Sequence, residues 1–170
     1  MRATPRASLA AVAIVFVVLT SLAAPLAAGA APGHEVPFKG SLQGVDALTF
    51  TVPCGPLAPF LLTGTGNATH LGRFTVDFPH CVNFANGFGS GTFVLTAANG
   101  DTVTGTVIGQ AVLPPANGVL SINETWTITG GTGRFGGATG IFTMARLNTG
   151  LDATTGSFAG TISSTGGSKH

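Results

Sequence analysis

The chain has 170 residues and few charges: Lys and Arg number 7, Asp and Glu number 6, and charged residues make up 8% of the total. A nucleic-acid-binding protein that works through a basic face needs clustered Lys and Arg, and a highly charged disordered chain needs far more charge, so the composition excludes both classes. The hydrophobic share of 44% is enough to form a buried core, while Gly is abundant at 26 residues and Tyr is absent.

The first thirty residues predict a secretory signal peptide. Arg2 and Arg6 precede an apolar run over residues 9–19, and a series of alanines follows. The run is shorter than the roughly 20 residues that a membrane-spanning helix needs, so it fits cleavage better than anchoring. We expect the cut between Ala30 and Ala31, which predicts a secreted, extracellular protein with no stable membrane anchor after cleavage. A retained N-terminal anchor is the alternative.

Cleavage would leave 140 residues, the size of one ordinary domain. We expect a β-barrel domain over residues 31–163 and a flexible C-terminal tail over residues 164–170. The exported part carries five basic and six acidic residues, a net charge of −1. Neither a nucleic acid nor an anionic membrane surface is implied as a partner.

Cys54 and Cys81 both lie in the exported part. In an oxidising compartment two such thiols are expected to form a disulfide, which would stabilise the domain by about 3 to 4 kcal/mol in the chain-entropy model. A pair of free buried thiols and a nucleophilic or metal-ligating Cys are the alternatives. His80 adjoins Cys81, but neighbours on a strand point to opposite faces, which disfavours a Cys–His pair.

The exported part shows period-two alternation broken by Gly, Asn and Pro every eight to twelve residues, which predicts an all-β fold. A turn is expected at Pro79, and Asn99-Gly100 is typical of a hairpin. A closed antiparallel β-barrel of about eight strands is the predicted architecture, because closure removes exposed strand edges. A β-sandwich is the competing interpretation. The expected strands cover residues 36–43, 48–52, 60–65, 69–78, 92–97, 102–112, 119–129, 142–147 and 157–163.

Residues 129–140 read Thr-Gly-Gly-Thr-Gly-Arg-Phe-Gly-Gly-Ala-Thr-Gly. This segment resembles the Gly-Gly-Thr-Gly-x-Phe…Ala-x-Gly segment of the dirigent and allene oxide cyclase superfamily of β-barrels and of their bacterial secreted relatives of unassigned function. Phe-Lys-Gly-Ser-Leu at residues 38–42 and Gly-Asn-Ala-Thr-His-Leu-Gly-Arg-Phe at residues 66–74 are also similar to those relatives.

The resemblance implies an eight-stranded barrel, often trimeric, whose apolar lumen holds a small hydrophobic substrate in the plant proteins. The cyclases isomerise an unstable epoxide, and the dirigent proteins steer the coupling of phenoxy radicals. No catalytic residue is carried over to this chain, because the matching segment is structural and its glycines serve a tight turn beside a strand.

Glu124 is oddly placed in the expected strand over residues 119–129, because it shares a face with Leu120, Ile122, Trp126 and Ile128. A carboxylate on a buried face must be paired, hydrogen-bonded or protonated, since an isolated buried charge costs several kcal/mol or more. Glu124 therefore needs a partner, a functional role or a place at the surface.

Arg146 follows Phe142 and Met144 at two-residue spacing and so lies on an apolar strand face as well. One interpretation is that Glu124 and Arg146 satisfy one another in or near the barrel end. His70 is expected to share a face with the apolar residues of the strand over residues 69–78. The other interpretation is a pocket in which Glu124 and His70 are catalytic candidates. Its ligand-binding residues would be Trp126, Arg146, Phe74 and Phe142.

The leading hypothesis is a secreted β-barrel that binds a small apolar ligand or has an extracellular structural role, without catalysis, cofactor or metal. His34, His80 and His170 share no spacing with a Cys or carboxylate that indicates a metal site. The alternative is an allene oxide cyclase-like isomerase or cyclase that acts in the lumen through Glu124 together with His70. An oligomeric surface or matrix protein is the third hypothesis, so a homo-oligomer is among the expected assemblies.

Overall fold

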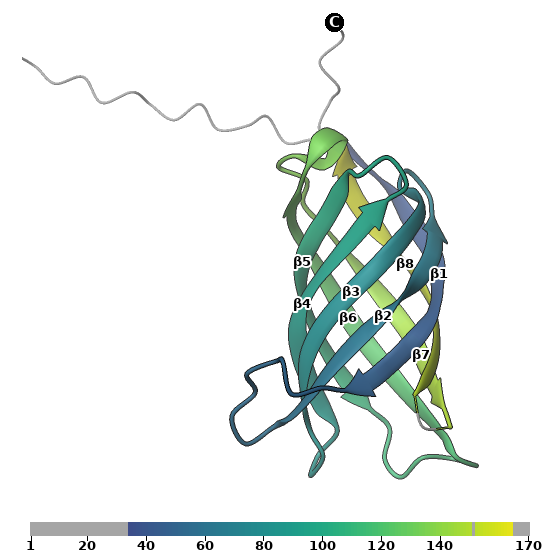
Figure 1. Ribbon diagram of the computed structural model, residues 1–170. Coiled ribbons are helices and arrows are strands. Elements are labelled where there is room, and N and C mark those ends of the chain that lie inside the picture. Colours follow the sequence, from purple (N-terminus) through teal and green to yellow (C-terminus); the bar gives the residue numbers. More distant parts are fainter. Residues whose placement is uncertain (1–33, 151, 165–170) are drawn as a thin grey trace, which may run out of the picture.

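The computed structural model describes residues 34–150 and 152–164 (Figure 1). The expected signal peptide, residues 1–30, lies outside the described residues. Of the expected tail, residues 164–170, Ser164 is the last residue of β8 and the rest lies outside the described residues. Within the described ranges no helix is long and apolar enough to span a bilayer. The strands are β1 (His34–Leu48), β2 (Ala58–Ala68), β3 (Gly72–Asn83), β4 (Phe88–Ala97), β5 (Thr102–Ala111), β6 (Val119–Gly131), β7 (Gly140–Thr149) and β8 (Ala153–Ser164), with a 3₁₀ turn, η1 (Gly133–Phe135), between β6 and β7.

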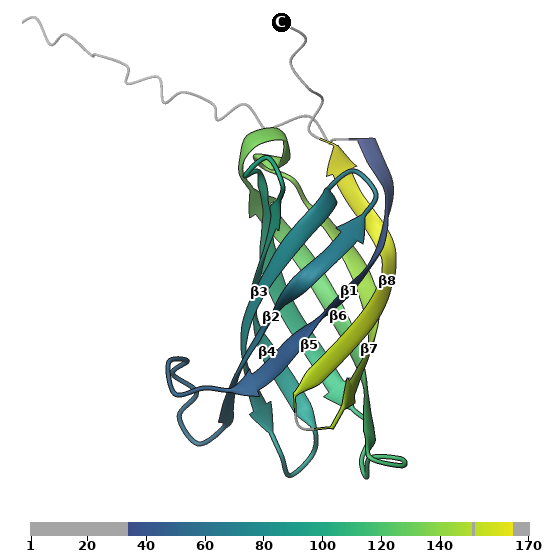
Figure 2. The same ribbon diagram turned by 45° about the vertical axis from the view of Figure 1, so that its right-hand side comes forward.

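These eight strands form a closed antiparallel barrel in chain order. Each strand pairs with the next, and β8 pairs with β1 over a register that runs from His34 opposite Ser164 to Val45 opposite Ala153. Figures 1 and 2 show the strands tilted around a common axis, as closure requires. The predicted all-β barrel of about eight strands is confirmed, and the β-sandwich interpretation is wrong, because every described strand has two paired neighbours.

β1 is longer than the sequence pattern predicts. It runs without a break through Gly44 and ends at Leu48, so the separate strand expected over residues 48–52 is wrong. Phe50 lies instead in the loop before β2 and is 93% exposed. Pairing explains the extension, because β2 and β8 both follow β1 through Gly44. As a result, the inward face of β1 continues from Leu42 to Asp46.

β3 also continues where a turn was expected, because it passes through Pro79. Pro79 pairs with Leu61 of β2, and the pairing to β4 resumes at His80 opposite Gly91. A proline lacks one ladder donor but does not end a strand whose neighbours remain in register. Gly91 lets β4 approach β3 closely at His80, since a Cβ at Gly91 would lie 2.7 Å from His80 Cβ. The continuation of β3 brings His80 into the lumen.

The two ends of the barrel differ. Leu71, Phe135 and Ala138 are buried at the end near η1, where the short helix covers the strands (Figure 1). Aromatic rings fill the middle: the Trp126 ring centroid lies 5.0 Å from that of Phe78 and 4.7 Å from that of Phe93. The barrel is therefore closed and packed from η1 to its middle.

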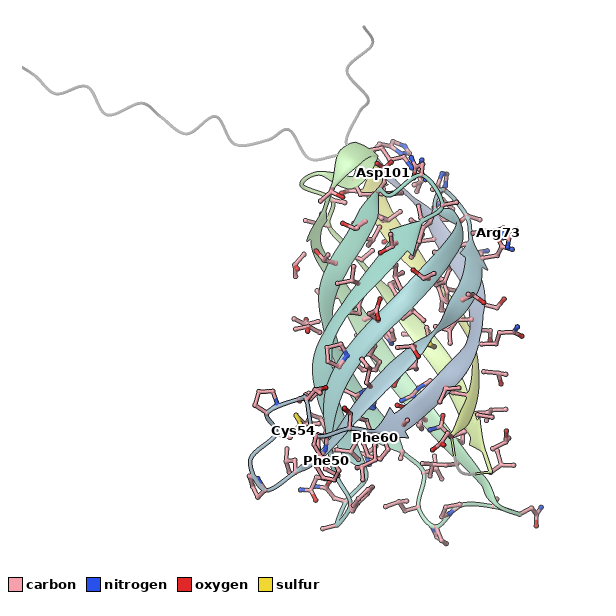
Figure 3. All side chains as sticks on the ribbon, in the orientation of Figure 1. Phe50, Cys54, Phe60, Arg73 and Asp101 are labelled. Atoms are coloured by element: carbon pink, nitrogen blue, oxygen red, sulfur yellow. A yellow bond between two sulfur atoms is a disulfide. The ribbon has the colours of Figure 1, made fainter. Side chains whose placement is uncertain are left out.

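The opposite end carries the loops between β1 and β2, β3 and β4, and β5 and β6. Cys54 and Cys81 form a disulfide that ties the first of these loops to β3, as expected from the sequence. Figure 3 shows Cys54, Phe50 and Phe60 together at this end, with Arg73 and Asp101 toward the other. We call this the open end, because the cavity described below lies beneath it.

Candidate functional site

Four ionisable side chains meet inside the barrel toward the open end. They are Asp46 on β1, His80 on β3, Glu124 on β6 and Arg146 on β7, and each is at most 5% exposed. Each occupies an inward position of its strand, between apolar inward neighbours or next to one. We call these four residues the buried cluster.

Arg146 is the centre of the buried cluster. Its Nε and Nη2 donate to Glu124 Oε1 at 3.0 and 2.8 Å, and its Nη1 donates to Asp46 Oδ2. Although burial acts to lower the pKa of Arg146, the carboxylates of Glu124 and Asp46 raise that pKa above its ordinary value. The expected pairing of Glu124 with Arg146 is confirmed.

Glu124 is held on both sides. Its Oε2 accepts a hydrogen bond from Trp126 Nε1 at 3.0 Å, while Oε1 faces Arg146. Gly109, opposite Glu124 on β5, makes room for the side chain, since a Cβ at Gly109 would lie 2.9 Å from Glu124 Cγ. A carboxylate that two buried donors hold in this way is suited to anchoring Arg146 and Trp126 rather than to moving a proton.

His80 lies with its ring between two phenyl rings. The Phe78 ring stacks on it at 4.3 Å between centroids and the Phe60 ring at 5.7 Å. His80 Nδ1 lies 3.0 Å from the carbonyl oxygen of Phe78. Because a carbonyl oxygen only accepts, Nδ1 carries the proton, and a neutral ring then has a bare lone pair on Nε2.

That lone pair faces a second acceptor. His80 Nε2 lies 3.5 Å from Asp46 Oδ1, and Oδ1 accepts no hydrogen bond from any residue that the structure describes. Burial lowers the pKa of His80 below its ordinary value, and the attraction of Asp46 offsets this only in part. At neutral pH the ring is therefore uncharged, and two acceptors face one another inside the barrel.

A cavity of about 80 Å³ lies beside the buried cluster. Phe84 and Gly87 line it from the β3–β4 connection and Ala111 from the last position of β5, which places it beneath the open end. The other lining residues are Asp46, Phe60, Phe78, His80, Val82, Gly89, Val107, Gly109, Leu120, Ile122, Glu124, Arg146 and Asn148. The cavity thus combines apolar walls with one polar side.

The residues that the sequence pattern predicts for a ligand-binding pocket do not all lie at the cavity. Glu124 and Arg146 line the cavity. Trp126 and Phe142 are buried in the aromatic middle, where their ring centroids lie 5.4 Å apart. Phe74 packs against Phe158 at 6.4 Å and is not among the residues that line the cavity.

His70 lies outside the lumen, contrary to the expected strand face. It occupies the turn between β2 and β3, is exposed, and has a φ of 63°. β3 starts only at Gly72, after the chain has turned, so the alternation that includes Phe74 and Val76 does not extend back to His70. Glu124 and His70 therefore do not share a pocket.

Sequence reasoning missed His80 and Asp46. Continuing the alternation of Phe74, Val76 and Phe78 for one more step would have placed His80 inward. Continuing it along β1 from Leu42 through Gly44 would have done the same for Asp46. Pro79 and Gly44 suggested strand ends, and cross-strand pairing overrides both signals.

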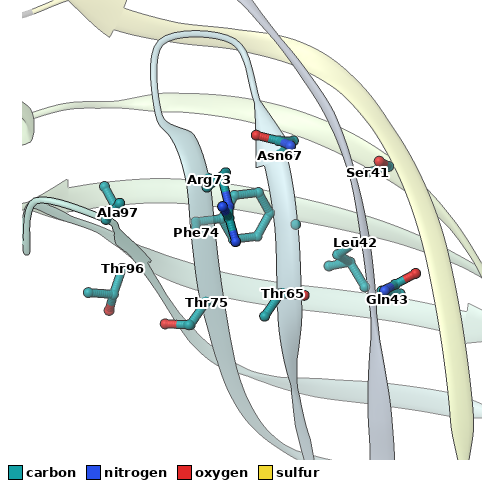
Figure 4. A pocket seen from close by; sticks show the side chains of 12 residues that line it. Ser41, Leu42, Gln43, Thr65, Asn67, Arg73, Phe74, Thr75, Thr96 and Ala97 are labelled. Atoms are coloured by element: carbon teal, nitrogen blue, oxygen red, sulfur yellow. The ribbon is translucent and has the colours of Figure 1, made fainter.

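A larger hollow of about 600 Å³ lies over β1 to β4 on the outside of the barrel (Figure 4). Gln43, Thr65 and Asn67, which line it, are exposed, and Arg73 is its charged residue. No buried side chain among its lining residues leaves a polar atom without a partner. This hollow is therefore a surface depression without the buried, unpartnered polar group that Asp46 provides in the lumen.

Within residues 34–150 and 152–164, no three His, Cys, Asp or Glu side chains are grouped so that they could hold a metal ion.

Comparison of the chain with known protein families, with curated proteins and with solved structures finds no match. The buried cluster and its cavity are therefore the features of the molecule that bear on its function.

Proposed function

We propose that the protein is a secreted, non-catalytic binder of a small, largely apolar molecule, which enters the barrel at the open end. The observation that supports this most directly is the cavity of about 80 Å³ whose walls are mainly apolar and whose polar side is the buried cluster. A concave apolar site with a few convergent polar groups is the usual form of a small-molecule site.

The size of the cavity constrains the ligand. A dry cavity of roughly 150 Å³ holds benzene, so a cavity of about half that volume admits only part of a ring-sized molecule. The rest of the ligand would lie on the apolar residues around the open end. Exposed apolar side chains are available there: Leu48, Phe50, Phe84, Phe88, Val112 and Leu113. We call these six residues the apolar rim.

The contacts of Glu124 favour binding over catalysis. An isomerase that used Glu124 as acid or base would have to break its hydrogen bonds to Arg146 or to Trp126 first. His70, the other candidate, is exposed in the β2–β3 turn. The resemblance of residues 129–140 to a superfamily whose plant members hold small hydrophobic substrates in an apolar lumen also supports a ligand in the barrel.

Native mass spectrometry of protein purified from its own culture medium tests the proposal. We expect a small molecule to co-purify and to be released by denaturation. A variant that fills the cavity, Gly89→Val, should lose the molecule, because Gly89 lines the cavity and a Cβ there would have no atom closer than 3.6 Å. Thr92→Val, on the exposed face of the same strand, is the matched control. Repeated absence of a bound molecule in the wild type would count against the proposal.

A further inference from the structure

We propose that the ligand is a primary amine with an apolar, aromatic body, and that its ammonium group donates to both His80 Nε2 and Asp46 Oδ1 from the cavity side. This rests on the proposed binding function and specifies the chemistry of the ligand. Two observations carry it: the buried Asp46 Oδ1, which has no hydrogen-bond donor among the described residues and lies 3.5 Å from His80 Nε2, and the net charge of the buried cluster.

The acceptor pair needs a donor. Asp46 Oδ1 and His80 Nε2 lie 3.5 Å apart on the polar side of the cavity, and Nδ1 of His80 is already used by the Phe78 carbonyl. Buried acceptors that stay unpaired are costly, so a ligand that brings several N–H donors gains more here than one that brings none. Asn148 also lines the cavity, and its Oδ1 accepts from Arg146 Nη1 at 3.4 Å while keeping a second lone pair.

The charges favour a cation. Asp46 and Glu124 contribute two negative charges and Arg146 one positive charge, so the buried cluster is −1 when His80 is neutral. A buried charge without a counter-charge is unfavourable, and a monovalent ammonium would neutralise it. A carboxylate ligand would raise the negative charge and is disfavoured for the same reason.

The walls favour an aromatic body. The Phe60 and Phe84 rings meet edge to face at 6.0 Å, and both residues line the cavity. Aromatic rings at this spacing pack well with a third ring and attract cations through their faces. The amine end would thus reach the acceptor pair while the ring stays near the apolar rim.

The test is a series of four probes whose side chains are three heavy atoms long: 2-phenylethylamine, 2-phenylethanol, propylbenzene and phenylacetate. Binding is measured by calorimetry and by the fluorescence of Trp126, the sole Trp of the chain. We expect the amine to bind about tenfold or more tightly than propylbenzene, with the carboxylate weakest. If no probe binds, the proposed function fails. If propylbenzene or the alcohol binds as tightly as the amine, the binding function stands and the amine inference is overturned.

Asp46→Asn tests the acceptor pair directly. The new amide can keep its oxygen toward Arg146 and donate to His80 Nε2, so the preference for the amine should disappear while propylbenzene binding persists. Asp77→Asn, the same change on the exposed face of β3, should keep the preference. An Asp46→Asn protein that keeps it too would overturn the inference.

A measurement on the wild type covers the case in which Asp46→Asn fails to fold. In ¹⁵N NMR spectra at pH 7, His80 should be neutral with its proton on Nδ1, and 2-phenylethylamine should shift the Nε2 resonance. An imidazolium in the ligand-free protein would supply both the donor and the charge that the ligand is inferred to bring, and would overturn the inference.

Discussion

Arg146 connects the side chains of the buried cluster, because its guanidinium donates to Glu124 and to Asp46 from one inward position of β7. Five fixed N–H donors make an Arg suited to two carboxylates at once. The neighbours are tied in as well, since Trp126 donates to the far oxygen of Glu124 and Asn148 Nδ2 donates to Asp46 Oδ2 at 3.1 Å. Removal of one charge should therefore lower the free energy of unfolding of the whole barrel.

Glu124→Gln should lower the free energy of unfolding by about 3 kcal/mol, because it removes one partner of a buried ion pair. The measurement is urea denaturation followed by circular dichroism. Glu35→Gln, an exposed carboxylate near the start of β1, should change stability by less than about 0.5 kcal/mol. An unchanged urea midpoint in Glu124→Gln would show that the pair contributes little to stability.

His80 should make the protein less stable in mild acid. Burial lowers its pKa in the folded protein below 6.5, so as pH falls through about 6.5 the unfolded chain takes up the proton first and unfolding becomes more favourable. This loss continues until the pH reaches the lower folded pKa. Above about pH 7.5 His80 is neutral in both the folded and the unfolded protein, so its titration should no longer make the free energy of unfolding depend on pH.

Denaturation of the wild type and of His80→Gln at pH 7.5, 6.5 and 5.5 checks this prediction. The wild type should lose stability across this range more steeply than His80→Gln, whereas His70→Gln should follow the wild type, since His70 is exposed. Parallel pH profiles for wild type and His80→Gln would mean that His80 titrates alike in the folded and unfolded states.

At the scale of elements, the strands position the buried cluster by running longer than their sequence patterns suggest. β1 continues to Leu48, and β3 continues through Pro79 to Asn83. Glycines on neighbouring strands then leave room for the large inward side chains. Gly91 does so for His80, and Gly109 does so for Glu124.

Gly109→Ala should therefore destabilise the barrel. Its Cβ would lie 2.9 Å from Glu124 Cγ, and a side chain held by Arg146 and Trp126 has little freedom to move. Overpacking of this kind costs about 1 to 3 kcal/mol, which thermal denaturation can measure. Gly89, paired with Gly109 across β4 and β5, is the control, because its added Cβ would have no neighbour closer than 3.6 Å. Equal effects of the two substitutions would contradict the steric explanation.

At the scale of the whole molecule, the barrel is asymmetric. Buried side chains close the end near η1, while the other end combines the cavity, the apolar rim and the Cys54–Cys81 disulfide. The disulfide links positions 27 residues apart and fixes the β1–β2 loop next to the cavity. The open end is thus the part of the surface where a ligand would enter.

Intact-mass analysis of protein from the culture medium should match residues 31–170, because the expected cleavage lies before Ala31. Reduction should add the mass of a pair of hydrogen atoms, as opening of the Cys54–Cys81 disulfide requires. A mass that includes residues 1–30, found only in the membrane fraction, would support the retained anchor instead. The same protein unreduced is the control for the second measurement.

The sequence by itself determined the fold class and part of the site. Period-two alternation is a local property, so it predicted the all-β fold and the inward positions of Glu124 and Arg146, while the removal of exposed strand edges favoured a closed barrel over a sandwich. It did not predict that β3 begins only after His70, because the exact start of a strand depends on its turn.

The tertiary structure alone decided which charges meet. Asp46 and Arg146 are 100 residues apart, and their contact exists only because closure brings β1 and β7 to opposite sides of β8. Pro79 and Gly44 look like strand ends in the sequence, yet neighbouring strands carry the pairing past both of them. Strand length in a barrel is set by partners that are distant in the chain, and for that reason the acceptor pair of His80 and Asp46 is found in the structure and not in the local pattern.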